Sequence, residues 1–185
     1  MQIKALLFAP LVATGLVSAV PSSKATNFEL LALRSASDIH FSPVQAALNH
    51  LFLHLPHQKA TCDAKPDNHA TFSLVDGELY LYRKSGMRQK LYVDRSGMGQ
   101  GILGYTTGNE PGPRNGERKG WKINKYGDLT FDGAGFIACT DSTKGSWSVG
   151  ISIGLSNPGG NEHCLGFTAR TITTRKPNSC KYTTQ

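Results

Sequence analysis

Segments with a helical repeat of apolar residues are missing from this sequence, and their absence indicates its fold class. Only residues 28–34, FELLALR, could form a helical turn or two. Twenty glycines and nine prolines divide the rest into short runs rich in β-branched, aromatic and aliphatic residues. Short runs separated by turn residues about every 8 to 12 positions are typical of β-sandwiches and β-barrels. We therefore predict a single small all-β domain.

Long apolar runs are also missing after the first twenty residues, since none reaches the ~18 residues that a membrane-spanning helix needs. The N-terminal run ALLFAPLVATGLVSAV follows Lys4, and Val17 and Ala19 are small residues at the −3 and −1 positions of a cleavage site. This arrangement is typical of a secretory signal peptide. We predict a signal peptide over residues 1–19 and a secreted, soluble domain over residues 20–185, with no membrane partner.

Cysteines are few, and none is paired in the Cys-x-x-Cys spacing that a structural zinc site favours. The sequence has four of them, Cys62, Cys139, Cys164 and Cys180, all after the predicted signal peptide. In an oxidising, secreted setting such cysteines form disulfides. Two disulfides are expected, for which three connectivities are possible. No metal and no cofactor is predicted.

Acidic residues are outnumbered, with 13 Asp and Glu against 20 Lys and Arg and a net charge of +7. Loss of residues 1–19 removes Lys4 and leaves +6. A basic surface favours acidic polymers, but the basic residues here form no block of five or six, so an ordinary solvated surface explains them as well. Nucleic acid is not predicted as a partner. The two densest groups are Lys84, Arg88, Lys90 and Arg95, and then Arg114, Arg118 and Lys119.

Several segments predict pairs of strands. ATFSLVDGELYLYR is expected to form a hairpin around Asp76-Gly77, and GWKINKYGDLTF another around Tyr126-Gly127. KLYVDRSGMGQGILGYTT predicts a third pair, and SWSVGISIGL and CLGFTARTITT the last strands. Residues 71–96 resemble residues 120–142, and residues 38–55 could be a third copy. Three such units would form a trefoil-like barrel, whereas a two-sheet sandwich remains the alternative.

Residues 33–47, LRSASDIHFSPVQAA, alternate small polar with apolar residues, which predicts a strand. Pro43 cannot donate to a sheet ladder, so it indicates a sheet edge or a bulge. We expect Ile39, Phe41 and Val44 to point inward and Asp38, His40 and Ser42 to point outward.

Residues 50–55, HLFLHL, are also expected to form a strand, with the three leucines on one face and His50, Phe52 and His54 on the other. His50 and His54 would then lie about 13 Å apart, too far to share a metal ion, and His57 would point away. These histidines are therefore interpreted as surface residues.

Hydrolase motifs are incomplete in this sequence. SWSVG, at residues 146–150, lacks the first glycine and the strand-to-helix context of a nucleophile elbow. The carboxylates that could act in pairs all adjoin glycines, where their role in turns is a sufficient explanation. No catalytic residue is predicted. The carboxylates concerned are Asp76, Glu117, Asp128 and Asp132.

Two alternative functions depend on residue type alone. Small, basic, two-disulfide secreted fungal proteins include ribonucleases of the ribotoxin kind, and His40, Glu78 and Arg83 or Arg95 could take the catalytic roles at a phosphodiester. Exposed aromatic rings could instead form a carbohydrate platform, although packing in the core is their usual role. The aromatic residues concerned are Tyr80, Tyr82, Tyr92, Tyr105, Trp121 and Trp147.

Four segments, LALRSASDIHFSPVQAA, QKLYVDRSGMGQGILGYT, GFIACTD and HCLGFTA, resemble the fungal cell wall protein PhiA family in the same order along the chain. That family includes IgE-binding surface allergens. The resemblance implies a secreted cell-wall protein with a structural or adhesive role, linked to asexual spore formation, and without established catalytic activity. Its implied partners are wall polysaccharides or other wall proteins. A secreted effector or carbohydrate-binding protein of the same fold is a further alternative.

The cysteines also support the resemblance, because Cys62, Cys139 and Cys164 fall at matching places. Here the family's usual second cysteine is missing, Asn-x-Ser/Thr glycosylation sites are absent, and the charge is basic where the members compared are commonly acidic. Cys139 ends one expected strand and Cys164 begins another that can return beside it, so we predict a Cys139–Cys164 disulfide. Cys62 would then pair with Cys180 and hold the C-terminal segment.

Overall fold

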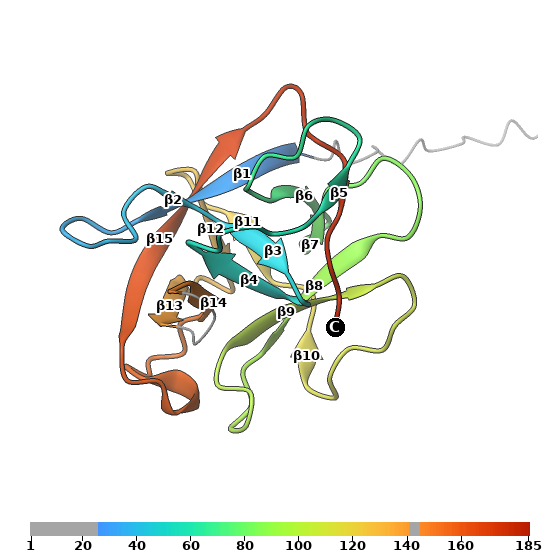
Figure 1. Cartoon of the computed structure of the whole chain (residues 1–185). Coiled ribbons are helices and arrows are strands. Elements are labelled where there is room, and N and C mark those ends of the chain that lie inside the picture. Colours follow the sequence, from blue (N-terminus) through green and yellow to red (C-terminus); the bar gives the residue numbers. More distant parts are fainter. Residues whose placement is uncertain (1–25, 141–144) are drawn as a thin grey trace, which may run out of the picture.

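The computed structural model describes residues 26–140 and 145–185. The predicted signal peptide, residues 1–19, lies outside the described residues, as does the start of the predicted domain. The all-β prediction is confirmed (Figure 1), since the described residues form strands and one short 3-10 helix, η1. No helix among them is both long and apolar enough to cross a bilayer. The first eight strands are β1 (Thr26–Leu33), β2 (Ser42–Pro43), β3 (Gln45–Ala47), β4 (His50–Leu53), β5 (Thr61–Cys62), β6 (Thr71–Val75), β7 (Glu78–Leu81) and β8 (Gln89–Asp94).

The remaining elements include β15, the longest strand among the described residues, which pairs with β1 and closes the sheet. They are β9 (Ile102–Thr107), β10 (Gly116–Glu117), β11 (Trp121–Ile123), β12 (Asp128–Phe131), β13 (Phe136–Thr140), β14 (Trp147–Ile151), η1 (Pro158–Gly160), β15 (Cys164–Thr173) and β16 (Cys180–Lys181).

Nine strands close into a barrel. Their order around the barrel is β1, β6, β7, β8, β9, β4, β14, β13, β15, and β15 then pairs with β1 again. The closure depends on β1, which pairs with β6 on one side and with β15 on the other. This closure confirms the barrel prediction, and the sandwich alternative is wrong. A closed barrel leaves its member strands no free edge.

Residues 28–34 were expected to include a helical turn, and this expectation is wrong. Residues 28–33 belong to β1, in which Phe28, Leu30 and Ala32 are buried and alternate with more exposed residues, and Arg34 follows the strand. A period of two is the period of a strand, and FELLALR satisfies it as well as it satisfies a helix. Pairing with strands far away in the sequence decides between the two structures.

The local hairpins are confirmed. β6 and β7 pair around Asp76 and Gly77, which both have the positive φ angles (49° and 77°) of a tight two-residue turn. β11 and β12 pair around a turn that contains Gly127, and β8 pairs with β9. The last expected strands are also present, as β14 and β15.

The expected internal repeat is not a structural repeat. In residues 71–96 the strand after the hairpin, β8, pairs with the hairpin itself. In residues 120–142 the corresponding strand, β13, pairs with β14 and β15 instead of with β12, and β11 and β12 lie outside the nine-strand barrel. Equal hydrophobic patterns therefore occupy different places in the fold.

Residues 33–47 do not form one alternating strand, because Leu33 ends β1 and residues 34–47 form a loop and two short strands. Ile39 and Val44 are buried as expected, but Phe41 has a positive φ of 61° and is 64% exposed, and Ser42 is buried. The chain turns at Phe41, so the alternation changes phase there. Pro43 lies in β2, the last strand on one side of the sheet, as expected for proline.

The strand that begins at His50 ends at Leu53, because His54 has a positive φ of 58°. Leu51 and Leu53 reach the main core, whereas Leu55 packs with Ala47 and Phe52 in a small separate cluster. The expectation that the three leucines share one face is therefore wrong for Leu55.

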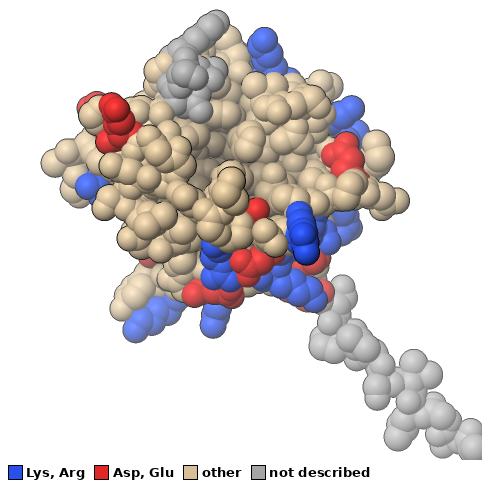
Figure 2. Space-filling model, turned by 90° about the horizontal axis from the view of Figure 1, so that it is seen from below, with Lys and Arg blue, Asp and Glu red and all other residues tan. Residues whose placement is uncertain are grey.

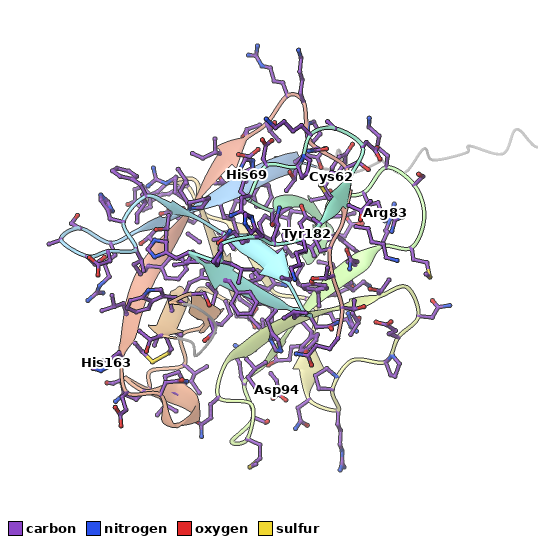
Figure 3. The ribbon with its side chains drawn as sticks, viewed as in Figure 1. Cys62, His69, Arg83, Asp94, His163 and Tyr182 are labelled. Carbon is purple, nitrogen blue, oxygen red and sulfur yellow. A yellow bond between two sulfur atoms is a disulfide. The ribbon has the colours of Figure 1, made fainter. Side chains whose placement is uncertain are left out.

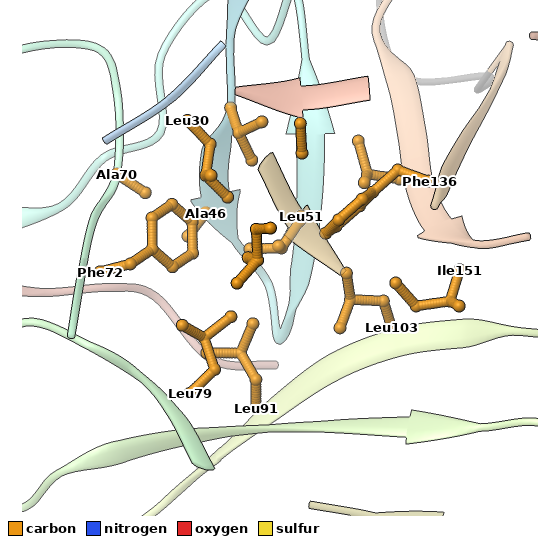
Figure 4. Packing of buried hydrophobic residues seen from close by; sticks show 14 of the residues in the cluster. Leu30, Ala46, Leu51, Ala70, Phe72, Leu79, Leu91, Leu103, Phe136 and Ile151 are labelled. Carbon is orange, nitrogen blue, oxygen red and sulfur yellow. The ribbon is translucent and has the colours of Figure 1, made fainter. Parts of the chain in front are cut away.

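The barrel is filled by apolar side chains from almost every strand. Figure 4 shows Leu30, Phe72, Leu79, Leu91 and Leu103 directed into the same interior. Each is at most 1% exposed. Burial of this kind is the main favourable contribution to folding, and it fixes the direction of the alternate residues, which must face solvent.

The C-terminal segment closes one end of the barrel. Tyr182 is 1% exposed, and its hydroxyl accepts a hydrogen bond from the backbone N–H of Thr71 at 3.0 Å. The buried Gln89 side chain binds the Tyr182 backbone twice, accepting from its N–H at 2.8 Å and donating to its carbonyl at 2.9 Å. The segment is therefore part of the core, and Figure 3 shows Tyr182 well inside the molecule.

Both disulfides join residues that lie directly opposite each other on antiparallel strands. Cys62 on β5 is bonded to Cys180 on β16, and Cys139 on β13 to Cys164 on β15. The first fixes the C-terminal segment just before Tyr182, and the second lies within the barrel wall.

Burial raises the pKa of Tyr182 to about 12, with the neighbouring Glu29 adding to the effect. A folded-state pKa above the unfolded value near 10 makes a contribution to stability that is complete below pH 10 and is lost as the pH rises to 12. Between pH 8 and 12 the free energy of unfolding should therefore fall by about 2–3 kcal/mol less in Tyr182→Phe than in the unchanged protein. Urea unfolding at pH 8 to 12 measures it. The matched control is Tyr126→Phe, at a 66% exposed tyrosine, and equal pH profiles for the two variants would contradict the prediction.

Candidate polymer-binding face

The outer surface of β6 to β9 collects the polar and aromatic residues of those strands. Leu79 and Leu81 of β7 point into the barrel, so the residues that alternate with them point outward. β8 alternates in the same way. Arg118 reaches this surface from the segment after β10, donating to the Lys90 carbonyl at 3.3 Å and to the Thr106 hydroxyl at 2.9 Å. The surface, here called the basic tyrosine face, consists of Ser73, Glu78, Tyr80, Tyr82, Arg88, Lys90, Tyr92 and Arg118.

The strand register brings residues from five strands into one row. Asn27 lies opposite Ser73, Ser73 opposite Tyr80, Tyr80 opposite Lys90, and Lys90 opposite Thr106. Directly opposite residues in antiparallel strands have Cβ atoms about 4.5–5.5 Å apart. The row therefore places polar groups of both hydrogen-bonding kinds beside the Tyr80 ring.

Glu78, Tyr80 and Lys90 form a hydrogen-bonded group at the centre of the face. The Tyr80 hydroxyl donates to Glu78 Oε2 at 2.5 Å, and Lys90 Nζ donates to the same oxygen at 3.0 Å. Burial alone would raise the pKa of Glu78, but these two donors and the charges of Lys90 and Lys119 outweigh it and lower the pKa. The pKa of Tyr80 is raised by burial and by the bond to Glu78. At neutral pH the group therefore holds an ionised carboxylate and a neutral phenol.

Two cations flank the Tyr80 ring. The Arg88 guanidinium carbon lies 5.6 Å from the ring centroid and Lys90 Nζ lies 5.2 Å from it. Both are within the range of cation–π attraction. Next to this group, the Tyr92 hydroxyl lies over Gly104, where a Cβ would come within 2.5 Å of the oxygen. The absence of a side chain at Gly104 lets the Tyr92 ring lie along the sheet.

A second ion-pair group borders the face. Arg95 donates to Glu117 through Nε, at 2.8 Å, and through Nη2, and Nη2 also donates to Asp132 at 2.8 Å. The hydrogen bond from Arg95 lowers the pKa of Glu117. Figure 2 shows Lys and Arg side chains interleaved with Asp and Glu along one side of the molecule, with more scattered charges elsewhere in that view. Charged side chains are therefore densest along that side of this view.

The residues that could act in a ribonuclease do not meet. His40 accepts a hydrogen bond from the Arg34 N–H at 3.1 Å and lies against the Phe41 ring, in the loop before β2. Glu78 and Arg95 are held by the partners given above, and β7 is separated from β2 by β6 and β1 in the sheet. The arrangement provides no shared site for an acid, a base and a phosphate-binding cation from this set.

The three neighbouring histidines also separate. His50 is in β4, His54 follows it and His57 lies in the next loop. His54 Nε2 lies 2.6 Å from the buried Ser42 Oγ. Among the described residues, no group of three or more His, Cys, Asp or Glu side chains is placed to hold a metal ion.

The expected aromatic platform is only partly present. Tyr105 and Trp121 are buried, at 0% and 3% exposure, and belong to the core. Trp147 is half-buried in β14. The other three, Tyr80, Tyr82 and Tyr92, lie together on the basic tyrosine face. No pattern in the sequence indicates a role for Asn27, because its place in the row with Ser73 and Tyr80 depends on the pairing of β1 with β6.

Together, the fold and this face define a small, disulfide-bonded β-barrel protein with an aromatic, basic surface. The family model described as PhiA-like secreted protein matches residues 28–183. The chain belongs to this family. It is 46% identical over 185 residues (99% of each chain) to "Cell wall protein phiA" of Aspergillus niger and 44% identical over 184 residues (99% of this chain, 100% of the relative) to the protein of the same name from Aspergillus fumigatus. It is 48% identical over 166 residues to the Emericella nidulans protein of that name (89% of this chain, 90% of the relative). No solved structure matches the chain.

Proposed function

We propose that this protein is a secreted component of the fungal cell wall with a structural or adhesive role, and that the basic tyrosine face holds it to acidic wall polymer. The names of the full-length relatives support the location. The face supports the mode of attachment, and the observation that carries it is the Tyr80 ring with the cations of Arg88 and Lys90 at 5.6 and 5.2 Å from its centroid. A flat ring with flanking cations suits a sugar ring that carries a negative charge.

The protein is proposed to be processed by removal of its signal peptide and to act during asexual development. Residues 1–19 act as the signal peptide and residues 20–185 are the secreted domain. The family resemblance extends the role to asexual development, in which phialides and conidia form.

The role is proposed to be non-catalytic, and the chemistry of the face supports this. A general acid at neutral pH needs a carboxyl group whose pKa is raised toward 7. The pKa of Glu78 is shifted in the opposite direction, and its carboxylate already accepts two hydrogen bonds. Purified protein should therefore leave RNA and wall polysaccharides intact, and turnover that His40→Ala or Glu78→Ala abolishes would overturn this part of the proposal.

Attachment through exposed charges predicts sensitivity to salt. Charges at a surface are screened over about 8 Å at physiological ionic strength, so the protein should be released from isolated walls as NaCl rises from 0.05 to ~0.5 M. The variant R88Q/K90Q should bind about tenfold more weakly at low salt. The fraction of protein that pellets with isolated walls at each NaCl concentration measures this effect.

The matched control removes two exposed loop charges elsewhere, in the variant K65A/K125A. The control should bind as the unchanged protein does. Equal loss in both variants would show that net charge alone is responsible, and binding that ignores salt would point to hydrophobic or covalent attachment.

A further inference from the structure

A groove at the edge of the basic tyrosine face lies where β1, β6 and β7 run side by side. Its volume is about 160 Å³. Ser73 occupies the middle position of the row between Asn27 and Tyr80. Because the serine side chain is small, the row is hollow at this point. The groove is lined by Asn27, Ser73, Val75, Tyr80, Leu81, Tyr82, Arg83 and Arg88.

Two guanidinium groups of this lining have no anionic partner, although that of Arg88 lies over the Tyr80 ring. Lys90, Arg95 and Arg170 each form an ion pair with a carboxylate. Across residues 26–140 and 145–185, by contrast, the side chains of Arg83 and Arg88 form no hydrogen bond or ion pair. Figure 3 shows Arg83 on the side of the molecule away from His163. Arginine presents a planar fork of donors that matches a carboxylate, so two arginines whose N–H groups lack acceptors favour an anionic ligand in the groove beside them.

The Arg83 head group lies beside a glycine turn that leaves room for it. Its guanidinium lies against the turn at Gly86, where a Cβ would come within 3.0 Å of Nη2. Gly86 has a positive φ of 86°, which suits glycine. The turn between β7 and β8 therefore leaves room for the Arg83 head group beside the groove.

The arginines require a hydrogen-bond acceptor on the ligand, whereas Asn27 requires a donor. Its Oδ1 is buried and accepts no hydrogen bond from any residue that the structure describes. Buried acceptors in native proteins nearly always have a donor. A carboxylate or a phosphate has no proton to donate when ionised, so the ligand that satisfies both Asn27 and the arginines carries a hydroxyl group as well as a negative charge.

The size and the aromatic wall indicate what bears these groups. A volume of about 160 Å³ is well below the ~300–1,000 Å³ of pockets for drug-sized ligands, which suits a single ring of a longer chain. Tyr80 and Tyr82 provide aromatic surface beside it. A pyranose ring with a ring carboxylate and free hydroxyls fits all three features.

We propose that this groove binds one hexuronate unit of an acidic polysaccharide. Arg83 and Arg88 bind the carboxylate, and the sugar ring lies against Tyr80 and Tyr82. The Asn27 amide, which lines the groove with its Oδ1 buried, turns on binding so that Oδ1 accepts a hydrogen bond from a ring hydroxyl. The proposal rests on the proposed function, since it specifies which acidic polymer the basic tyrosine face holds. Binding at this groove differs from a general attraction of anions because it also requires a hydroxyl group on the ligand.

The test compares three probes on the secreted protein by calorimetry at physiological salt: a hexagalacturonate, the neutral hexagalactose and a polyphosphate of matched charge. Hexagalacturonate is expected to bind at least tenfold more tightly than either of the others. R83Q should lower that affinity about tenfold. R83K keeps the charge without the planar fork, so its affinity should be only slightly higher than that of R83Q. N27A should weaken hexagalacturonate several-fold and leave polyphosphate unchanged.

The outcomes separate this proposal from the proposed function. If hexagalacturonate binding falls in R88Q/K90Q but is unchanged in R83Q and N27A, the face binds acidic polymer and the groove proposal is wrong. Equal affinity for polyphosphate also overturns the groove proposal. If none of the acidic probes binds while the protein still pellets with walls, attachment through acidic polymer is wrong as well. Thermal melting of each variant, compared with K65A/K125A, separates lost binding from lost folding.

Discussion

Replacing both Cys62 and Cys180 by alanine is expected to lower the free energy of unfolding by about 5 kcal/mol, the loss that the chain-entropy model gives for a link across this much of the chain. The two residues are 118 positions apart. The bond also fixes the segment that leads to the buried Tyr182. The C-terminal residues should therefore lose their place in the barrel end at the same time, which removes the hydrogen bonds between Gln89 and the Tyr182 backbone.

Urea unfolding of the unchanged protein and two double variants measures this effect. The matched comparison is replacement of Cys139 and Cys164, which are 25 positions apart, with an expected loss of about 3.5 kcal/mol. The strands β13 and β15 are held there by four consecutive residue pairs in any case. A larger loss in the second variant, or peptides joining Cys62 to Cys139 or Cys164 in a non-reducing digest, would contradict the prediction.

Phe136→Ala is the second change with a large expected effect, at about 3–5 kcal/mol of lost stability. Phe136 is 1% exposed, and its ring lies between those of Trp121, at 6.2 Å, and Phe167, at 5.6 Å. These contacts join the β11–β12 hairpin to the barrel wall. The truncation leaves a cavity where two elements meet, so neither element can close it without moving the other.

The matched control is Phe41→Ala, the same change at a ring that is 64% exposed. It should alter stability by no more than about 0.5 kcal/mol. Both values come from the midpoint and slope of chemical unfolding. A large loss in Phe41→Ala would place Phe41 inside, as its alternation with Ile39 predicts, and would contradict the turn at that residue.

The contrast between Phe136 and Phe41 shows which parts of the fold could be predicted. Asp76-Gly77 and Gly127 set hairpins because tight hairpin turns need residues with a positive φ, and this requirement acts within a few residues. Phe41 also adopts a positive φ, but nothing in its residue type announces it. The hydrophobic pattern therefore predicts which face of a strand a residue occupies only until the chain turns at a residue whose type does not indicate a turn.

The candidate site divides in the same way. The outward positions of Tyr80 and Tyr82 follow from alternation in β7, and the charge of Arg88 and Lys90 is visible in the sequence. Their meeting with Asn27 is not visible, because β1 and β6 are separated by a long stretch of chain and pair through the barrel closure.

By itself, the sequence determined the all-β class, the local hairpins and the family. Each of these depends on short-range patterns of residue type, or on the order of motifs along the chain. The tertiary structure alone decided that β1 is a strand, that nine strands close into a barrel, and that Asn27, Tyr80 and the two arginines share one groove. These features depend on pairing between distant segments, whose free energy comes from burying both partners together, and no local pattern specifies which segments will meet.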